Sequence, residues 1–110
     1  MLLSLERPLA VFDLETTGIR IGKDRIVQIG IVRLLPGGER ERYQTLVNPE
    51  MPIPPEATAV HGISDFDVAF APRLHEVAAE VLGQMAGTST VGFNVIRFDV
   101  HFLSEGLHRV

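Results

Sequence analysis

The stretch that decides the fold is Leu9-Ala10-Val11-Phe12-Asp13-Leu14-Glu15-Thr16-Thr17-Gly18, an apolar run that ends in two acidic residues and a turn. Its residues alternate in character, which is the two-residue period of a β-strand. One face would carry Ala10, Phe12 and Leu14, and the other Val11, Asp13 and Glu15. We therefore predict a buried strand over residues 9–14 whose two carboxylates leave the same side.

Two further strands are predicted directly after this one. Residues 25–35 alternate apolar residues with smaller or polar ones, which indicates a second strand. Pro36-Gly37-Gly38 then turns the chain, because proline presets φ and glycine accepts positive φ. Residues 40–47 follow as a partly solvated third strand, so the first three strands are expected to form an antiparallel meander.

The second half of the chain is predicted to be mainly helical. Four prolines within residues 48–55 exclude a sheet interior and indicate an ordered loop, and helix is expected only after it. Pro72 suits the first position of a helix that Gly87 would end. The apolar stripe of this helix consists of Leu74, Val77, Ala78, Val81, Leu82 and Met85. Residues 90–93 are predicted as a short buried strand, and a last helix is expected from about Arg97.

Element order and composition both indicate one globular domain. The order βββαβα predicts an α/β fold, in which a helical crossover leads from three antiparallel strands to a fourth and helices cover the sheet. Apolar residues make up 45% of the 110 residues and charged residues 22%, which is enough apolar material for one core.

The composition also excludes several kinds of function. Without cysteine the chain has no disulfide, thiolate metal site or cysteine nucleophile, and we expect a cytoplasmic protein with no membrane span. The net charge of −4 argues against a protein that holds nucleic acid mainly by neutralising phosphates. A nucleic-acid enzyme remains open, because carboxylates can hold divalent cations that face the phosphate.

Asp13 and Glu15 are the first candidates for a metal site. Two like charges on one strand face repel each other, and a bound cation would compensate them. Carboxylate oxygens suit Mg²⁺ or Mn²⁺ rather than zinc. On this triplet alone, a strand end that reaches solvent is the better interpretation. The following Thr16-Thr17-Gly18 adds hydroxyls, backbone N–H groups and a flexible glycine that could hold a nucleotide, although an ordinary turn is the alternative.

Asp99 is the third acidic candidate. It falls in the first turn of the last predicted helix, on the same face as Phe102 and Leu103. The commoner reason for such a residue is its favourable interaction with the helix N-terminus, worth about 0.3–1 kcal/mol. However, a strand beside the first one would end near Asp13 and Glu15, so that three carboxylates could converge.

Three segments resemble the DEDDh 3′→5′ exonucleases, a family that includes the proofreading subunit of bacterial DNA polymerase III. Asp13-x-Glu15-Thr16-Thr17-Gly18 is similar to the first motif of that family, and Gly92-x-Asn94-x-x-x-Phe98-Asp99-x-x-Phe102-Leu103 to the second. Residues 55–64 resemble the segment that helps to form the substrate pocket. The resemblance implies a ribonuclease H-like fold with a mixed sheet. It also implies hydrolysis with two Mg²⁺ or Mn²⁺ ions, which releases nucleoside monophosphates from a single-stranded or frayed 3′ end of DNA or RNA. A DNA polymerase subunit is a candidate partner.

The resemblance also implies roles for individual residues. The acidic residues Asp13, Glu15 and Asp99 would be catalytic and metal-binding. The substrate would be contacted by Leu14, Thr16, Thr17, Glu56, His61, Asn94 and Phe98. Taken alone, His61 reads as a polar loop residue, and Asn94 could serve as structural support.

The sequence departs from the family pattern in three places. Phe93 stands where many relatives carry histidine, and His101 where many carry proline. The third motif, a histidine general base five residues before the last metal-binding aspartate, is not found after Asp99. We therefore expect residues 1–110 to form a single exonuclease domain that lacks its C-terminal part.

Such a fragment would have little activity of its own, and its unpaired sheet edge would favour self-association. Two alternatives to the exonuclease remain. One is a non-catalytic nucleic-acid-binding or polymerase-associated module of the same fold. The weaker one is an endonuclease that acts on RNA–DNA hybrids.

Overall fold

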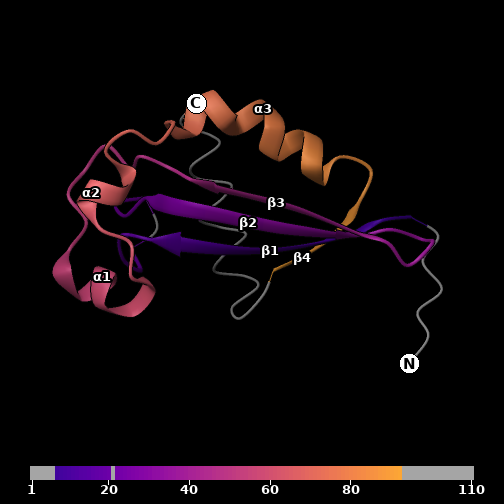
Figure 1. Cartoon of the computed structure of the whole chain (residues 1–110), viewed down its shortest axis with the longest axis horizontal. Helices are drawn as coiled ribbons and strands as arrows, with labels where there is room; N and C mark the ends of the chain where they lie inside the picture. The colour runs from indigo at the N-terminus through magenta and orange to yellow at the C-terminus, as the bar shows by residue number, and fades with distance from the viewer. Residues whose placement is uncertain (1–6, 21, 93–110) are drawn as a thin grey trace.

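The computed structural model describes residues 7–20 and 22–92. The elements are β1 (Leu9–Thr16), β2 (Ile26–Leu34), β3 (Arg40–Leu46), α1 (Pro55–His61), α2 (Asp65–Val68), α3 (Leu74–Met85) and β4 (Ser89–Gly92). Figure 1 shows α3 lying along the sheet, with α1 and α2 together beyond one end of the strands.

The strands form one mixed sheet in the order β3-β2-β1-β4. The three N-terminal strands pair antiparallel, and β4 pairs parallel with β1 from Leu9↔Ser89 to Phe12↔Gly92. The predicted meander and the crossover to a parallel fourth strand are therefore confirmed. The pairing of β1 with β2 shifts register between Glu15 and Thr16, because Glu15 pairs with Gln28 and Thr16 with Ile26, so that β2 carries one extra residue, Val27, beside the end of β1.

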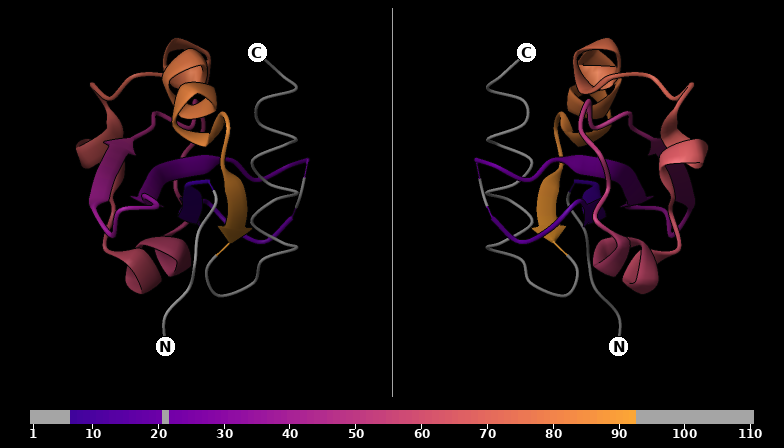
Figure 2. Two further views of the ribbon diagram at one scale, coloured as in Figure 1. Left: turned by 90° about the vertical axis from the view of Figure 1, so that its right-hand side faces the viewer. Right: turned by 90° about the vertical axis from the view of Figure 1, so that its left-hand side faces the viewer.

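The main core lies between the sheet and α3. Ala10, Phe12 and Leu14 are buried in β1, as their alternation predicts, and they pack in one cluster with Val77 and Val81 of α3. Helix α3 covers one face of the sheet, and α1 lies towards the opposite side (Figure 2). Burial of this apolar surface is the main force that holds α3 on the sheet.

A second, smaller core lies at the end of the sheet. It joins Val27 of β2 to Ile53 of the proline-rich loop, Ile63 between α1 and α2, and Val68 of α2. This cluster anchors α1 and α2 beside the last residues of β1. The loop is ordered, as its prolines predict, and its final proline, Pro55, is the first residue of α1.

Helix α3 differs from the prediction in two respects. It begins at Leu74 rather than at Pro72, because Arg73 is extended and its N–H donates to Glu76 Oε1 at 2.8 Å. Pro72 instead accepts a backbone hydrogen bond from Asn48 at 2.8 Å, which ties it to the loop. Leu82, predicted in the buried stripe, is 54% exposed, because the sheet covers a narrower face of the helix.

The remaining boundaries agree closely with expectation. Strand β4 spans residues 89–92 instead of 90–93. The short helix α2 was not predicted, and its start is set by Ser64, whose hydroxyl accepts from the Asp67 N–H at 3.3 Å. The helix expected from Arg97 lies outside the described residues.

Candidate active site at the end of β1

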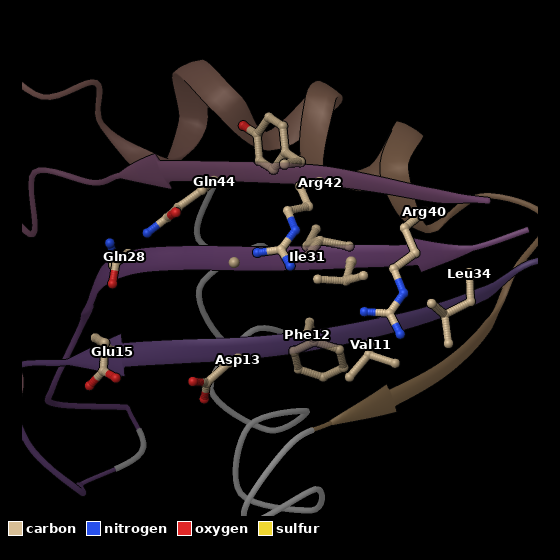
Figure 3. A pocket seen from close by; sticks show the side chains of 13 residues that line it. Val11, Phe12, Asp13, Glu15, Gln28, Ile31, Leu34, Arg40, Arg42 and Gln44 are labelled. Atoms are coloured by element: carbon tan, nitrogen blue, oxygen red, sulfur yellow. The ribbon is translucent and has the colours of Figure 1, made fainter. Parts of the chain in front are cut away.

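The two acidic residues of β1 extend from the sheet face that α3 leaves uncovered (Figure 3). In the pairing with β2, Asp13 lies opposite Gly30, which has no side chain to cover it. Both carboxylates line a groove of about 460 Å³, to which Arg40 and Arg42 of β3 also contribute. The prediction that both acids leave one face of the strand therefore holds.

Burial and charge act together on Glu15. Burial raises the pKa of Glu15 above its ordinary value and the negative charge of Asp13 raises it further, while the positive charge that His61 carries when both ring nitrogens are protonated lowers it. The environment therefore disfavours two charged carboxylates here, and a divalent cation would offset that repulsion. Carboxylate oxygens are the donor type that Mg²⁺ and Mn²⁺ prefer, so the residues fit such an ion.

Asp24 holds the loop that follows β1. Its side chain is 3% exposed, and its carboxylate accepts from the Thr17 hydroxyl and from the Arg20 N–H, each at 2.9 Å. A Cβ atom on Gly18 would lie 2.5 Å from Asp24 Oδ2, so the loop passes too close for any other residue at position 18. Burial raises the pKa of Asp24, but the hydrogen bonds from Arg20 and Thr17 outweigh it and leave the pKa below its ordinary value.

His61, at the end of α1, fastens the loop from the other side. Its Nε2 lies 3.0 Å from the carbonyl oxygen of Thr16, and its Nδ1 accepts from the Ile63 N–H at 3.1 Å. Gly62 takes a left-handed conformation with φ 77°, which ends the helix and lets the chain fold back beside the ring. Both ring nitrogens are therefore engaged by the protein's own backbone.

A cleft of about 680 Å³ opens between this loop and α1. Its lining includes Leu14, Glu15, Thr16, Thr17, Glu56 and His61, which were all singled out from the sequence. Ile19 and Val60, which were not predicted, also line the cleft and are 81% and 85% exposed. They add exposed apolar surface to the lining of the cleft. Glu15 lines both the cleft and the groove on the sheet face, so the two spaces meet at this carboxylate.

The structure brings part of the predicted site together. Thr17 belongs to the loop, but its hydroxyl points inward to Asp24 and is 1% exposed, so any contact with a substrate would not use that hydroxyl. The Thr16 hydroxyl likewise donates to the Gly18 carbonyl at 2.6 Å. Asn94, Phe98 and Asp99 lie outside the described residues. Among residues 7–20 and 22–92, no three side chains of metal-binding type come together, so Asp99 stays a predicted third ligand.

Asp24 is the functional residue that the sequence prediction missed. An aspartate in a polar turn before a strand looks like an ordinary surface residue. The one available signal is its position seven residues after Thr17, across the same turn.

The arrangement is that of a ribonuclease H-like fold: a mixed sheet with two carboxylates at the end of one of its two inner strands, β1. A crystal structure of E. coli exonuclease I in complex with a dA16 oligonucleotide has this fold, with a TM-score of 0.83. The two sequences are 21% identical, and the match covers 94% of this chain and 24% of that one. This likeness shows the fold alone.

The sequence comparison shows the family. Residues 10–110 match the family described as Exonuclease (RNase_T), and the chain belongs to it. A DNA polymerase III subunit epsilon-like protein of Rhodobacter capsulatus is 46% identical over 96 residues, which cover 84% of this chain and 14% of the relative. A protein of Staphylococcus haemolyticus named 3′-5′ exonuclease DinG is 35% identical, over 87% of this chain and 11% of its own length. The chain thus spans a small part of these relatives.

None of the helices in the described part of the chain has the length and apolar character needed to cross a membrane.

Proposed function

We propose that the protein to which this chain belongs removes nucleoside monophosphates from the 3′ end of a nucleic acid by hydrolysis. The observation that carries this proposal is the position of Glu15. It lies beside Asp13 on the sheet and also lines the 680 Å³ cleft, so a phosphodiester at the cleft mouth would face both carboxylates. The 3′→5′ direction is supported by the names of relatives such as the DinG protein.

Asp13 and Glu15, together with the predicted ligand Asp99, would hold two Mg²⁺ ions or Mn²⁺ ions. When bound, such ions lower the pKa of a water and stabilise the leaving oxygen of an in-line displacement. The task of the chain is to hold the carboxylates rigidly and to place the terminal nucleotide against them. The raised pKa of Glu15, which is caused first by burial and then by the charge of Asp13, supports the proposed ion site, because a divalent cation would offset the cost of charging both carboxylates.

The cleft would receive the terminal nucleotide. Ile19 and Val60 offer exposed apolar surface against which a base could pack, and Glu56, on the first turn of α1, offers a carboxylate for a sugar hydroxyl. Because no base edge is read by this surface, we expect little dependence on the identity of the terminal base. Both DNA and RNA ends remain substrates under this proposal.

The test uses the full-length protein with strands labelled at either end. We expect Mg²⁺-dependent release of labelled mononucleotide from the 3′-labelled strand at the first turnover, and loss of that release in Asp13→Ala. His75→Ala, a change on the exposed side of α3, is the matched control and should retain activity. Cleavage of a circular strand at the same rate as a linear one would contradict an end-dependent enzyme and favour the endonuclease.

The second candidate is a module that binds a polymerase or a nucleic acid and does not cut. It is favoured by one observation, the name of the epsilon-like relative, which links this family to a polymerase. Under this alternative the full-length protein would bind a 3′-ended strand, and neither Mg²⁺ nor Asp13→Ala would change the length of that strand.

A further inference from the structure

We propose that His61 is a positioning residue, which as a neutral imidazole protonated at Nε2 holds the Thr16 carbonyl and thereby fixes the chain beside Glu15. This inference rests on the proposed function, because it concerns the same metal site. It gives His61 a different role from the nucleotide contact that the family resemblance implies.

The tautomer is assigned from the two contacts of the ring. The Ile63 N–H is a donor and lies 3.1 Å from Nδ1, so Nδ1 must carry a lone pair. Nε2 therefore carries the proton of the neutral ring and donates it to the Thr16 carbonyl, 3.0 Å away. Neither nitrogen is then available to take a proton from a water, which excludes His61 as the general base of the reaction.

The ring is held rigidly enough to act as a clamp. Gly62 closes α1 with its N–H donating to the Thr58 carbonyl at 2.7 Å, and the Thr58 hydroxyl donates to the Ile63 carbonyl at 2.8 Å. Ile63 itself is 8% exposed and belongs to the second core. The N–H that orients the ring is thus anchored in packed structure, and α1 cannot turn without breaking these contacts.

The atom that His61 holds lies where positioning matters most. Thr16 directly follows Glu15, at the register shift between β1 and β2. The extra residue Val27 of β2 interrupts the regular pairing at this point, so the backbone of Thr16, which adjoins Glu15, needs a further contact to fix its direction. The next residue is fixed by the residue that precedes β2, since the Thr17 N–H donates to the Arg25 carbonyl at 2.8 Å. Without His61, the end of β1 would lose its hydrogen bond to α1.

Two substitutions separate hydrogen bonding from shape. His61→Phe keeps a flat ring but removes both hydrogen bonds. His61→Gln keeps an amide N–H that can reach the Thr16 carbonyl in place of Nε2. His75→Phe, on an exposed position of α3, controls for the loss of a histidine.

The first measurement is the ¹⁵N spectrum of the imidazole groups in the 110-residue chain. The His61 signals are identified by their loss in His61→Phe. We expect an Nδ1 signal typical of an unprotonated nitrogen and an Nε2 signal typical of a protonated one. A ring protonated at Nδ1 at neutral pH overturns the proposal, whatever the activity of the protein.

The second measurement is Mn²⁺ binding to the full-length protein with the same substitutions, followed by the relaxation of water protons, with Asp13→Ala as reference. Loss of an outer partner of a metal ligand weakens binding about 10–100-fold, and we expect the lower end for His61→Phe, about tenfold. His61→Gln should restore most of the affinity, and His75→Phe should match the unaltered chain. Thermal unfolding of each variant identifies any loss that comes from unfolding alone.

The outcomes distinguish this inference from the proposed function. If Asp13→Ala abolishes Mn²⁺ binding and His61→Phe leaves it unchanged in a folded protein, His61 does not position the site, although the metal site stands. If Asp13→Ala binds Mn²⁺ as well as the unaltered chain does, the proposed metal site itself is wrong. Equal loss in His61→Gln and His61→Phe would show that the Thr16 hydrogen bond is not what matters, and would also overturn the proposal.

Discussion

Replacement of Asp24 by alanine tests how firmly the loop after β1 is held. The Thr17 hydroxyl is 1% exposed, and without Asp24 it can turn only to Met51 Sδ, 3.5 Å away and a weak acceptor. A buried donor that loses its acceptor costs about 1–3 kcal/mol. Arg20 is exposed, so in Asp24→Ala its backbone N–H can bind water instead, and the loss of this hydrogen bond adds little to the loss of stability. We expect Asp24→Ala to lower the free energy of unfolding by about 2–3 kcal/mol, since the acceptor lost is charged.

The assay is urea unfolding of the 110-residue chain, followed by circular dichroism. With a urea m-value of about 1–2 kcal/mol/M, the expected loss shifts the midpoint by roughly 1–3 M. Glu39→Gln is the control, because Glu39 is exposed and the change removes a carboxylate elsewhere on the surface. If Asp24→Ala stays within about 0.5 kcal/mol of that control, the carboxylate does not hold the loop and the reasoning fails.

The pH dependence of stability, compared between the unaltered chain and Asp24→Asn, gives an independent check on the role of Asp24. Because the pKa of Asp24 is lowered in the folded chain, its carboxylate stabilises the fold above the unfolded-state pKa, which is about 3.9. That contribution is lost as the pH falls through the lower, folded-state value. The difference in stability between the unaltered chain and Asp24→Asn should therefore be constant from about pH 5 to pH 7 and shrink below about pH 4.

Gly18 should be coupled to Asp24. A methyl group at position 18 would overlap the carboxylate, at 2.5 Å, so Gly18→Ala is expected to cost about 1–3 kcal/mol. In Asp24→Ala the overlapping atoms are gone, so the double variant should lose less stability than the sum of the single changes. Additive losses would show that the two residues do not meet.

Three further changes have definite expected outcomes. Gly62→Ala places a side chain at φ 77° and should lose about 1 kcal/mol, whereas Gly83→Ala, in open space on α3, should gain about 0.5–1 kcal/mol in the same urea assay. Burial raises the pKa of Tyr43, and its hydrogen bond to Glu80 and the charge of Glu80 raise it further. Glu80→Gln should therefore lower that pKa, which the phenolate absorbance reports cleanly because the chain has one tyrosine and no tryptophan.

The features predicted correctly from sequence are those set by local periodicity. The alternation in residues 9–14 is enough to place Asp13 and Glu15 on one face, because a strand admits only two faces. The prolines of residues 48–55 likewise exclude strand without reference to any partner. Family resemblance added candidate residues that spacing alone does not single out, among them His61 as a contact of the terminal nucleotide.

The features missed depend on contacts between distant residues. Proline suits a first helical position, but the Pro72 carbonyl accepts a hydrogen bond from the N–H of Asn48, 24 positions earlier, which ties Pro72 to the loop outside α3. Which faces of α3 are covered depends on the width of the sheet beneath it, which leaves Leu82 exposed. The contact of His61 with Thr16 spans 45 positions, so the tautomer of its ring cannot be read from its neighbours in sequence.

The way in which the site is braced follows from the chemistry proposed for it. Asp13 and Glu15 repel each other, and the regular pairing of β1 with β2 is interrupted directly after Glu15, so contacts on both sides of the strand end are needed to hold the two carboxylates in place. Asp24 provides one tie from the β1–β2 connection, and His61 provides the other from α1. Neither contact uses a group that the reaction requires. Asp24 is a buried carboxylate, and His61 is a neutral ring whose two nitrogens are both engaged by the backbone. The carboxylates that face the cleft are thereby left to bind metal ions.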